Sequence, residues 1–417
     1  MNEAKEFVPS EASAESPASA EEFRSSVRRW LEENCPQALR GGGVMYHGGR
    51  KESVDPLVLQ WFDACYSRGW TVPTWPRAYG GAGLDAEHAR ILREEMDSIG
   101  APLPLNGQGV TVIGPAILEI GTPEQKLRHL PRIARGEARW CQGFSEPNAG
   151  SDLAALTTSA RLDGDDYIVN GSKTWTTHGE LSDWMFCLVR TDATAPKRNG
   201  ISVLLLSMDA AGVSTKPIVL ISGRSVFCEC FFTDVRVAAA DLLGRRNEGW
   251  TTARRILEHE RSSESRPGGI IGSGPGSGSG GDGRTLSMLA REYGAGPDGR
   301  MRDPLVRQRI AEVEMEQRAL ALTQRRADEE RARSGKGVPS EETSMFKYLS
   351  TELTSRRMET YLNIMGFQGL GWEGDSYTPQ ELQATRYWLY SKAFTIAGGC
   401  SEVQLDIIAN RILGLPK

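Results

Sequence analysis

The sequence has little that would mark a membrane, nucleic-acid or metal-binding protein. It contains no apolar run near the roughly 20 residues that a membrane-spanning helix needs. Lys and Arg number 49 against 54 for Asp and Glu, so the net charge is −5. No global basic field therefore favours nucleic acid or an anionic membrane surface. The five histidines show no metal-ligand spacing, and we expect no bound metal.

Cysteine is also scarce and irregularly placed. The seven cysteines are an odd number at uneven spacing, which argues against a disulfide framework. Cys228 and Cys230 are two apart in an alternating run, so we expect two half-buried strand residues that face one side. The Ala-, Ser- and Glu-rich start over 1–19 resembles neither a signal peptide nor a transit peptide. We expect a disordered lead-in and a cytoplasmic protein.

The pattern of apolar residues divides the remaining chain into three parts. Helical periodicity covers 20–139, strand-like alternation covers 140–247, and helical periodicity returns over 248–417. This order predicts an α+β multi-domain fold. Its parts are an N-terminal α-helical domain, a small middle antiparallel β-barrel or sandwich, and a C-terminal α-helical bundle.

One glycine-rich stretch departs from these patterns. Residues 267–284 contain a G-x-G-x-x-G spacing, but no strand precedes it and no apolar helix opens at its third glycine. We expect a flexible loop rather than a dinucleotide-binding turn.

Three segments carry the chemistry: WCQGFSEPNAGSD at 140–152, VNGSKTWTT at 169–177 and IAGGCSEVQ at 396–404. Together, in this order and inside a helix–β–helix frame, they resemble the acyl-CoA dehydrogenase family. The resemblance runs from about residue 20 to residue 417. It implies an FAD-dependent enzyme that removes one hydrogen from each of the α and β carbons of an acyl-CoA.

The first two segments supply candidate cofactor residues. Alone, the 144–151 loop is as compatible with a plain Ser/Gly turn as with a site for a flavin edge and a pantetheine amide. The resemblance assigns Phe144 and Ser145 to the flavin and Ser151 to the pantetheine arm. Trp175 and Thr177 are two apart, hence on one face of a strand. An isolated Trp there is more often a core residue, but the resemblance places both beside the flavin ring.

The reaction needs a base for the α proton, and a carboxylate with a raised pKa is the natural acceptor. Many family members carry this Glu at the position of Gly398, which has no side chain. The resemblance to the isovaleryl and long-chain branches points instead to Glu260. Glu258 lies about 200° away around a helix, so only one of the two can face the flavin. Alone, Glu260 would more often be a surface residue.

Further roles follow only from the resemblance. Arg261 lies next to the active site, and the Gly398 N–H binds the thioester carbonyl. Arg291 reaches the flavin pyrophosphate of a neighbouring subunit. The remaining cofactor positions are Asn363, Gly366, Cys400 and Glu402; Asn363 and Gly366 would touch the adenosine part of FAD from another subunit. The resemblance therefore implies a homodimer or homotetramer, reoxidised by an electron-transfer flavoprotein.

Two alternatives remain open from the sequence. The chain is also compatible with a flavin oxidase or monooxygenase on the same fold, and with a non-catalytic subunit that binds acyl-CoA. The acyl group is not identified.

Overall fold

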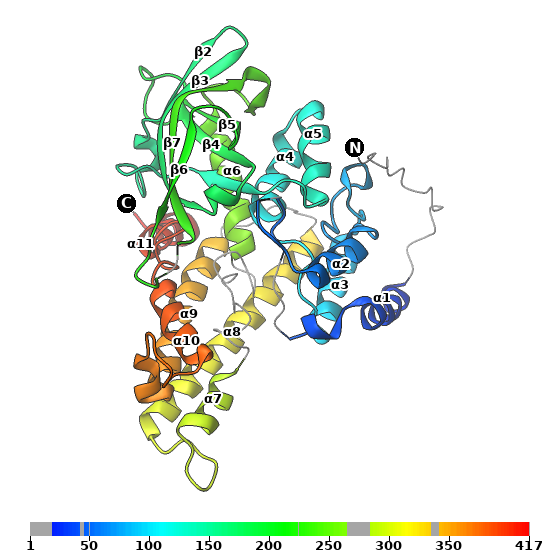
Figure 1. The fold of residues 1–417 in the computed structure, drawn as a ribbon, viewed down its shortest axis with the longest axis vertical. Helices are drawn as coiled ribbons and strands as arrows, with labels where there is room; N and C mark the ends of the chain where they lie inside the picture. Colours follow the sequence, from blue (N-terminus) through cyan, green and yellow to red (C-terminus); the bar gives the residue numbers. More distant parts are fainter. Residues whose placement is uncertain are drawn as a thin grey trace.

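A computed structural model describes residues 19–41, 46–49, 51–223, 225–264, 284–334 and 342–416. The predicted disordered lead-in, except Ser19, and the predicted flexible loop, except Arg284, lie outside the described residues. Within them the order is helices, then a sheet, then helices (Figure 1), which confirms the predicted fold class.

The N-terminal part consists of helices and short turns. Its helices are α1 (Ala20–Asn34), α2 (Pro56–Tyr66), α3 (Ala86–Ser98), α4 (Gly114–Ile120) and α5 (Pro123–Ala134), with short helical turns η1 (Gln37–Leu39) and η2 (Arg77–Tyr79) and the π-helix η3 (Gly109–Ile113). Helix α5 begins at a capping box, in which the Thr122 side chain accepts from the Gln125 N–H and Pro123 opens the helix.

The middle part is one curled sheet. Its strands are β1 (Trp140–Gly143), β2 (Ser159–Asp163), β3 (Asp166–Thr177), β4 (Trp184–Arg190), β5 (Ile201–Ser207), β6 (Val213–Ile218), β7 (Phe227–Ala238) and β8 (Leu242–Leu243), with 3-10 turns η4 (Leu153–Ala155), η5 (Gly179–Leu181) and η6 (Ala239–Asp241). In the described chain the order is β6-β7-β3-β2-β4-β5-β8, and β1 pairs in parallel with β4. β5 also approaches β7, although three strands separate them in that order. The sheet therefore folds around its own core.

The sheet contains two departures from the sequence-based expectation. Residues 140–143, expected to begin a loop, form strand β1. Cys228 and Cys230 do face one side, with their Sγ atoms 3.7 Å apart, but both are fully buried rather than half-buried. No cluster of His, Cys, Asp and Glu suited to a metal ion occurs among the described residues.

The C-terminal part is a bundle. It contains α6 (Gly249–Glu264), α7 (Leu286–Tyr293), α8 (Pro304–Ser334), α9 (Glu342–Met365), α10 (Pro379–Ser391), α11 (Ser401–Ile407), η8 (Gly366–Leu370) and the π-helix η9 (Ile408–Ile412). The expected helix over 401–413 thus divides at Ile407. In the described ranges, no helix combines the length and the apolar content that crossing a membrane requires.

One hydrophobic core joins all three parts at helix α6. It contains Val112 of η3, Leu188 and Val203 of the sheet, and Ala253 and Ile256 of α6. Ile256 is fully buried, and burial of such a side chain contributes about 1.5–3 kcal/mol. Helix α6 is therefore held firmly between the sheet, the N-terminal helices and α9.

Candidate active site

Strand β3 presents an exposed indole at the boundary between the sheet and the bundle. Trp175 has a φ of 59°, which is left-handed, and lies where the β3–β7 register shifts. Its side chain is 56% exposed and its ring contacts Phe227 edge-on at 6.1 Å. Phe227 in turn stacks on Tyr390 of α10. Because strained backbone in a non-glycine residue persists where its surroundings impose it, this position is a candidate for function.

Trp175 and Thr177 lie on the same face of β3, as the sequence predicts. Thr177 pairs directly with Phe227, and directly paired residues project to the same face of a sheet. The Trp175 ring contacts that same Phe227. A planar group could therefore lie against the indole with the Thr177 hydroxyl beside it.

The loop after β1 is anchored by a buried ion pair that sequence reasoning missed. Lys173 Nζ lies 2.8 Å from Glu146 Oε1, with the side chains 0% and 5% exposed. Glu146 also accepts from the Thr157 N–H and hydroxyl and from the Thr158 N–H. Burial opposes ionisation, but the Lys173 charge and these donors prevail and lower the pKa of Glu146 to about 2. The loop is therefore fixed against β3.

The same loop holds Phe144 and Ser145. The Phe144 ring is buried and meets Phe186 edge-on, so any flavin contact would use its backbone. The Ser145 carbonyl accepts from the Thr174 N–H at 2.9 Å, next to Trp175. Ser151 is exposed further along, beside the Asp152–Lys197 ion pair. Ser145 and Trp175 are thus brought together, and Ser151 lies on the surface.

The two glutamates near the end of α6 have different neighbours. Glu258 pairs with Arg255, which also contacts Glu119 of α4. Glu260 instead accepts a 3.3 Å hydrogen bond from the Gln142 side-chain amide on β1. Because Gln142 lies three residues before Ser145, Glu260 faces the strand that leads into the predicted flavin loop.

The surroundings of Glu260 favour its neutral form. Burial raises the pKa of Glu260, while the Gln142 hydrogen bond and the charges of Arg261 and Lys347 act in the opposite direction without cancelling the effect. Lys347 of α9 is fully buried, and its ammonium donates to the Phe394 carbonyl at 2.7 Å. A carboxyl group with a raised pKa beside a flavin loop is suited to accept a proton.

A double-glycine turn precedes α11. Gly398 and Gly399 have φ values of 66° and 93°, and the Gln404 side-chain amide donates to both carbonyls. Within the described ranges, the Gly398 N–H donates to no backbone carbonyl. The family resemblance assigns this N–H to the thioester carbonyl of a bound substrate.

The start of α11 differs in detail from the sequence-based expectation. Cys400 is the N-cap residue, but its thiol makes no capping hydrogen bond. The Ser401 hydroxyl donates to Glu352 at 2.6 Å. Glu402 is exposed in the first helical turn. A helix N-terminus here could still attract phosphate through its backbone N–H groups.

Three candidate cofactor residues lie away from this boundary. Arg291 is exposed on α7, at the far end of the bundle from the sheet (Figure 1). Asn363 and Gly366 are exposed at the junction of α9 and η8. The structure does not bring these residues to Glu260 or Trp175, which agrees with a role toward a different subunit.

The residues at the boundary fit a flavin. An exposed indole held in a left-handed conformation offers a platform for a planar ring, and the Gly398–Gly399 turn offers a backbone donor nearby in the bundle. Gln142, Glu146, Lys173 and Lys347 were the functional candidates that sequence reasoning missed. A lysine and a glutamate inside the first two family-like segments were the available signal, because neither residue type is usually buried unless paired.

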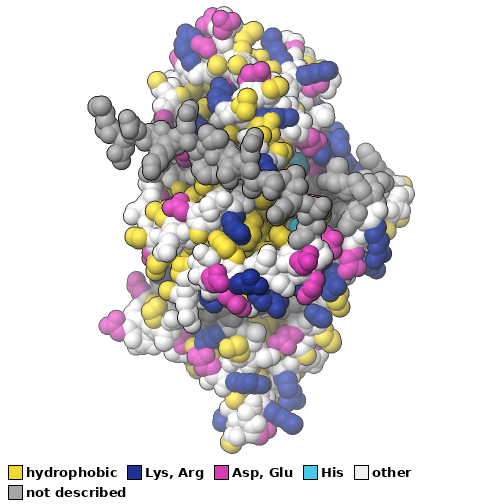
Figure 2. Space-filling view, turned by 90° about the vertical axis from the view of Figure 1, so that its right-hand side faces the viewer, with side chains coloured by type: hydrophobic (Ala, Val, Ile, Leu, Met, Phe, Trp, Pro, Cys, Tyr) yellow, Lys and Arg dark blue, Asp and Glu magenta, His cyan; other side chains and the backbone are white. Residues whose placement is uncertain are grey.

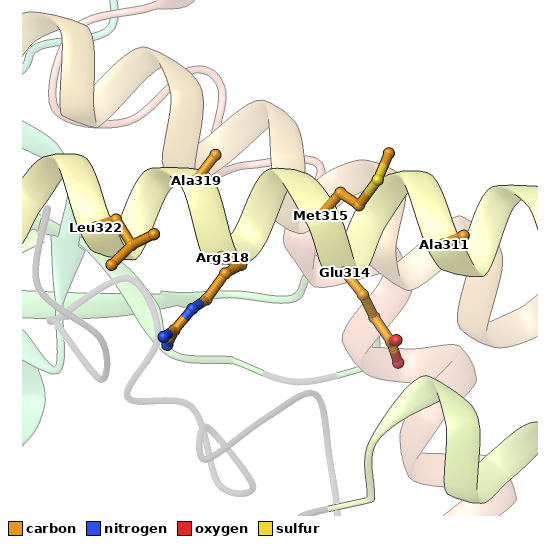
Figure 3. Close-up of a pocket in the computed structure, with 6 residues that line it drawn as sticks. All are labelled: Ala311, Glu314, Met315, Arg318, Ala319 and Leu322. Atoms are coloured by element: carbon orange, nitrogen blue, oxygen red, sulfur yellow. The ribbon is translucent and has the colours of Figure 1, made fainter.

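A hollow on helix α8 lacks the side chains that catalysis would need. It lies along the outer face of α8 and is lined by Ala311, Glu314, Met315, Arg318, Ala319 and Leu322 (Figure 3). Met315 is 66% exposed, and the hollow contains no nucleophile or buried base. The face shown in Figure 2 mixes acidic and basic side chains without a large field of one sign.

Comparisons with known proteins identify the family of the chain. Models of the N-terminal, middle and C-terminal domains of acyl-CoA dehydrogenase match residues 17–137, 141–235 and 287–413. Acyl-CoA dehydrogenase IpdE1 of Mycobacterium tuberculosis is 35% identical over 408 residues, covering 95% of this chain and 98% of the relative. Acyl-CoA dehydrogenase FadE26 of the same organism is 33% identical over 361 residues, covering 84% and 86%.

Solved structures share the whole architecture. The "Tcur3481-Tcur3483 steroid ACAD" has a TM-score of 0.73 at 27% identity, covering 97% of this chain and 99% of that one. The ChsE4-ChsE5 complex from Mycobacterium tuberculosis has a TM-score of 0.71 at 29% identity, covering 97% and 100%. Three matched domains, full-length relatives and a site built from the family's segments lead to one conclusion: this chain belongs to the acyl-CoA dehydrogenase family, whose members are FAD-dependent oxidoreductases.

Proposed function

We propose that the chain dehydrogenates an acyl-CoA across its α and β carbons, with Glu260 as the base for the α proton. One observation carries the proposal. Glu260 is hydrogen-bonded to the strand that leads into Ser145, and the Ser145 carbonyl is bonded to β3 beside Trp175. A carboxylate of raised pKa, a cofactor loop and an indole platform are thus connected over a short stretch of structure.

The proposed step conserves atoms and electrons. The α C–H bond breaks, its proton goes to a Glu260 carboxylate oxygen, and its electron pair forms the new α–β double bond. A bound FAD supplies the acceptor for the β hydrogen, which leaves with the electron pair of its own bond. The products are a trans-2-enoyl-CoA, a protonated Glu260 and a two-electron-reduced cofactor. We propose an electron-transfer flavoprotein as the partner that removes those electrons.

The Gly398 N–H would assist proton removal by binding the thioester carbonyl. Charge builds up on that oxygen as the α proton leaves, and one well-placed donor typically contributes about 3 kcal/mol to the transition state. The left-handed turn and the Gln404 bonds hold this backbone in place.

We propose a bulky, ring-bearing acyl group of the steroid-derived kind as the substrate class. The support is the solved structure named a steroid ACAD, whose fold matches 97% of this chain. A base on α6 is compatible with branched, long or cyclic chains, so the site geometry does not oppose this class.

The test is anaerobic flavin reduction with a panel of linear, branched and steroid-carboxylic acyl-CoAs. Glu260→Gln should reduce its flavin at least about 10²-fold more slowly than wild type, because a positioned base contributes about 10²–10⁴-fold. Glu258→Gln is the matched control, since Glu258 pairs with Arg255, and it should keep a rate within about threefold of wild type.

The outcomes separate the alternatives. Reduction of Glu260→Gln at the wild-type rate would exclude Glu260 as the base. Binding of every acyl-CoA without any flavin bleaching would favour a non-catalytic subunit. Rapid reoxidation in air with release of peroxide would favour an oxidase. Fastest reduction by a linear acyl-CoA would reject the steroid-derived class alone.

We also propose that the working form is a homodimer or homotetramer. Arg291, Asn363 and Gly366 are exposed, and the family resemblance assigns them to the flavin of another subunit. Light scattering of the purified protein should give a mass at least twice that of the 45.7-kDa chain. A monomer that gains flavin only when mixed with a different chain would instead indicate a heteromer.

A further inference from the structure

Gln142 is the side chain on β1 that contacts the proposed base. Its Nε2 donates to Glu260 Oε2 at 3.3 Å, across a sequence separation of 118 residues. Both neighbours of Gln142 in the strand, Cys141 and Gly143, are buried, and β1 pairs in register with β4. A Cβ at Gly143 would lie 2.2 Å from Met185 Sδ, so β1 is packed tightly against β4. The amide therefore extends from a rigid support.

The other end of the same amide is unsatisfied. Gln142 Oε1 is buried and has no hydrogen-bond partner in the part of the chain that the structure describes. A buried acceptor without a partner is unfavourable, so such atoms in folded proteins usually have a use. Protonation of Glu260, which is the outcome of the proposed reaction, would create a donor beside this amide.

We propose that Gln142 is a positioning residue that holds Glu260 in both of its protonation states. This inference rests on the proposed function of Glu260. Before proton transfer, the Nε2–H group donates to the carboxylate. After transfer, a half-turn of the amide places Oε1 where Nε2 was, and the new carboxyl O–H donates to it. The Gln142 amide thus offers the Glu260 carboxyl group a hydrogen-bond partner both before and after proton transfer. The backbones of β1 and α6 do not have to move.

Charged groups near Glu260 act on its pKa together with the Gln142 amide. Arg261 on α6 and Lys347 on α9 are the cations that act on it. Glu119 of α4 is engaged with Arg255 and His259, and Arg255 also holds Glu258. The described strand β5 and π-helix η3, which also pack on α6, contain no ionisable side chains. Gln142 is a neutral neighbour of Glu260, so replacing it with methionine removes a hydrogen bond without removing a charge.

The test uses the flavin-loaded protein with Gln142→Met and Gln142→Glu. Methionine keeps the length and removes the amide, so the carboxylate loses a donor. Glutamate adds a like charge. The pH at which Glu260 ionises should rise in the order wild type, Gln142→Met, Gln142→Glu, by about one unit or more at the first step. A role in packing alone would not produce this order.

Two measurements report the pH at which Glu260 ionises. The first is the pH dependence of anaerobic reduction by the acyl-CoA of the panel that reduces wild type fastest; its acid limb should move to higher pH in the same order. The second needs no substrate. Infrared difference spectra recorded during a pH titration show the protonated carboxyl band that disappears in Glu260→Gln, and its midpoint should move likewise.

Failure of the Gln142 role and failure of the Glu260 role would give different experimental results. A midpoint that stays within about 0.3 unit in all three proteins, with the band still assigned to Glu260, would overturn the role of Gln142 and leave the base in place. Wild-type reduction by Glu260→Gln would instead remove the base itself, and with it the premise of the positioning role.

Discussion

Glu146 and Glu260 are both acidic side chains with buried surroundings, yet their contacts give them opposite properties. Glu146 lies 2.8 Å from the Lys173 ammonium and accepts three further hydrogen bonds from Thr157 and Thr158. Glu260 accepts a 3.3 Å hydrogen bond from the neutral Gln142 amide, and the charges of Arg261 and Lys347 do not offset the effect of burial on its pKa. The difference teaches that the charge of the adjacent groups, rather than burial alone, separates a structural anion from a carboxyl group of raised pKa.

The largest loss of folding stability is expected when Lys173, the cation beside Glu146, is removed. Lys173→Met leaves a buried carboxylate without its partner, which typically costs about 3–5 kcal/mol of folding free energy. Urea unfolding of the flavin-loaded protein measures this cost. Lys197→Met is the matched control, because Lys197 pairs with Asp152 on the surface and should cost about 1 kcal/mol or less. Equal costs for the two variants would contradict the structural role of the buried pair.

A second prediction concerns stability in acid. The pKa of Glu146 lies at about 2 in the folded protein, below its ordinary 4.5. Ionised Glu146 therefore stabilises the folded protein above pH 4.5, and this stabilisation is lost as the pH falls toward 2. Its size is on the order of 3 kcal/mol. Unfolding free energies measured over this range should fall with pH in wild type. The fall should be shallower in Glu146→Gln, and identical slopes would count against the ion pair.

For Glu260, the dependence of folding stability on pH should have the opposite sign. Its pKa is raised in the folded state, so the folded protein binds the proton more tightly than the unfolded chain does. Stability should decline as the pH rises from the unfolded value of 4.5 through the folded value, by about 1.4 kcal/mol for each unit of the shift.

Glu260→Gln tests this sign because glutamine does not ionise. The variant should melt at a higher temperature than wild type at about pH 8 and at nearly the same temperature at about pH 4. Calorimetry at the two pH values measures the difference. A lower melting temperature at the higher pH would mean that the carboxylate is stabilised in the folded protein.

Local patterns predicted what depends on local forces. Strand-like segments are expected over 140–247, and the strands Trp184–Arg190 and Ile201–Ser207 lie within that range. Each is a nearly continuous run of buried residues, which is typical of a strand covered on both faces. Helix geometry indicates that only one of Glu258 and Glu260 can face the flavin, and the family resemblance selects Glu260. The structure gives the two residues different partners.

The missed features depend on pairing between distant segments. β1 has four residues and pairs in parallel with β4 more than 40 positions later, which no local period reveals. The Lys173–Glu146 pair spans 27 residues, and the Gln142–Glu260 bond spans 118. A lysine or glutamine in a sequence looks like a solvent-facing residue until its partner is placed.

The left-handed backbone at Gly398 also limits how this active site could change. A side chain there would adopt a conformation that costs an L-residue about 1–2 kcal/mol, at a φ of 66°. A glutamate placed at this turn would therefore carry a backbone cost that a glutamate on helix α6 does not. If Glu260 is the base, as we propose, glycine at position 398 keeps the turn free of that cost.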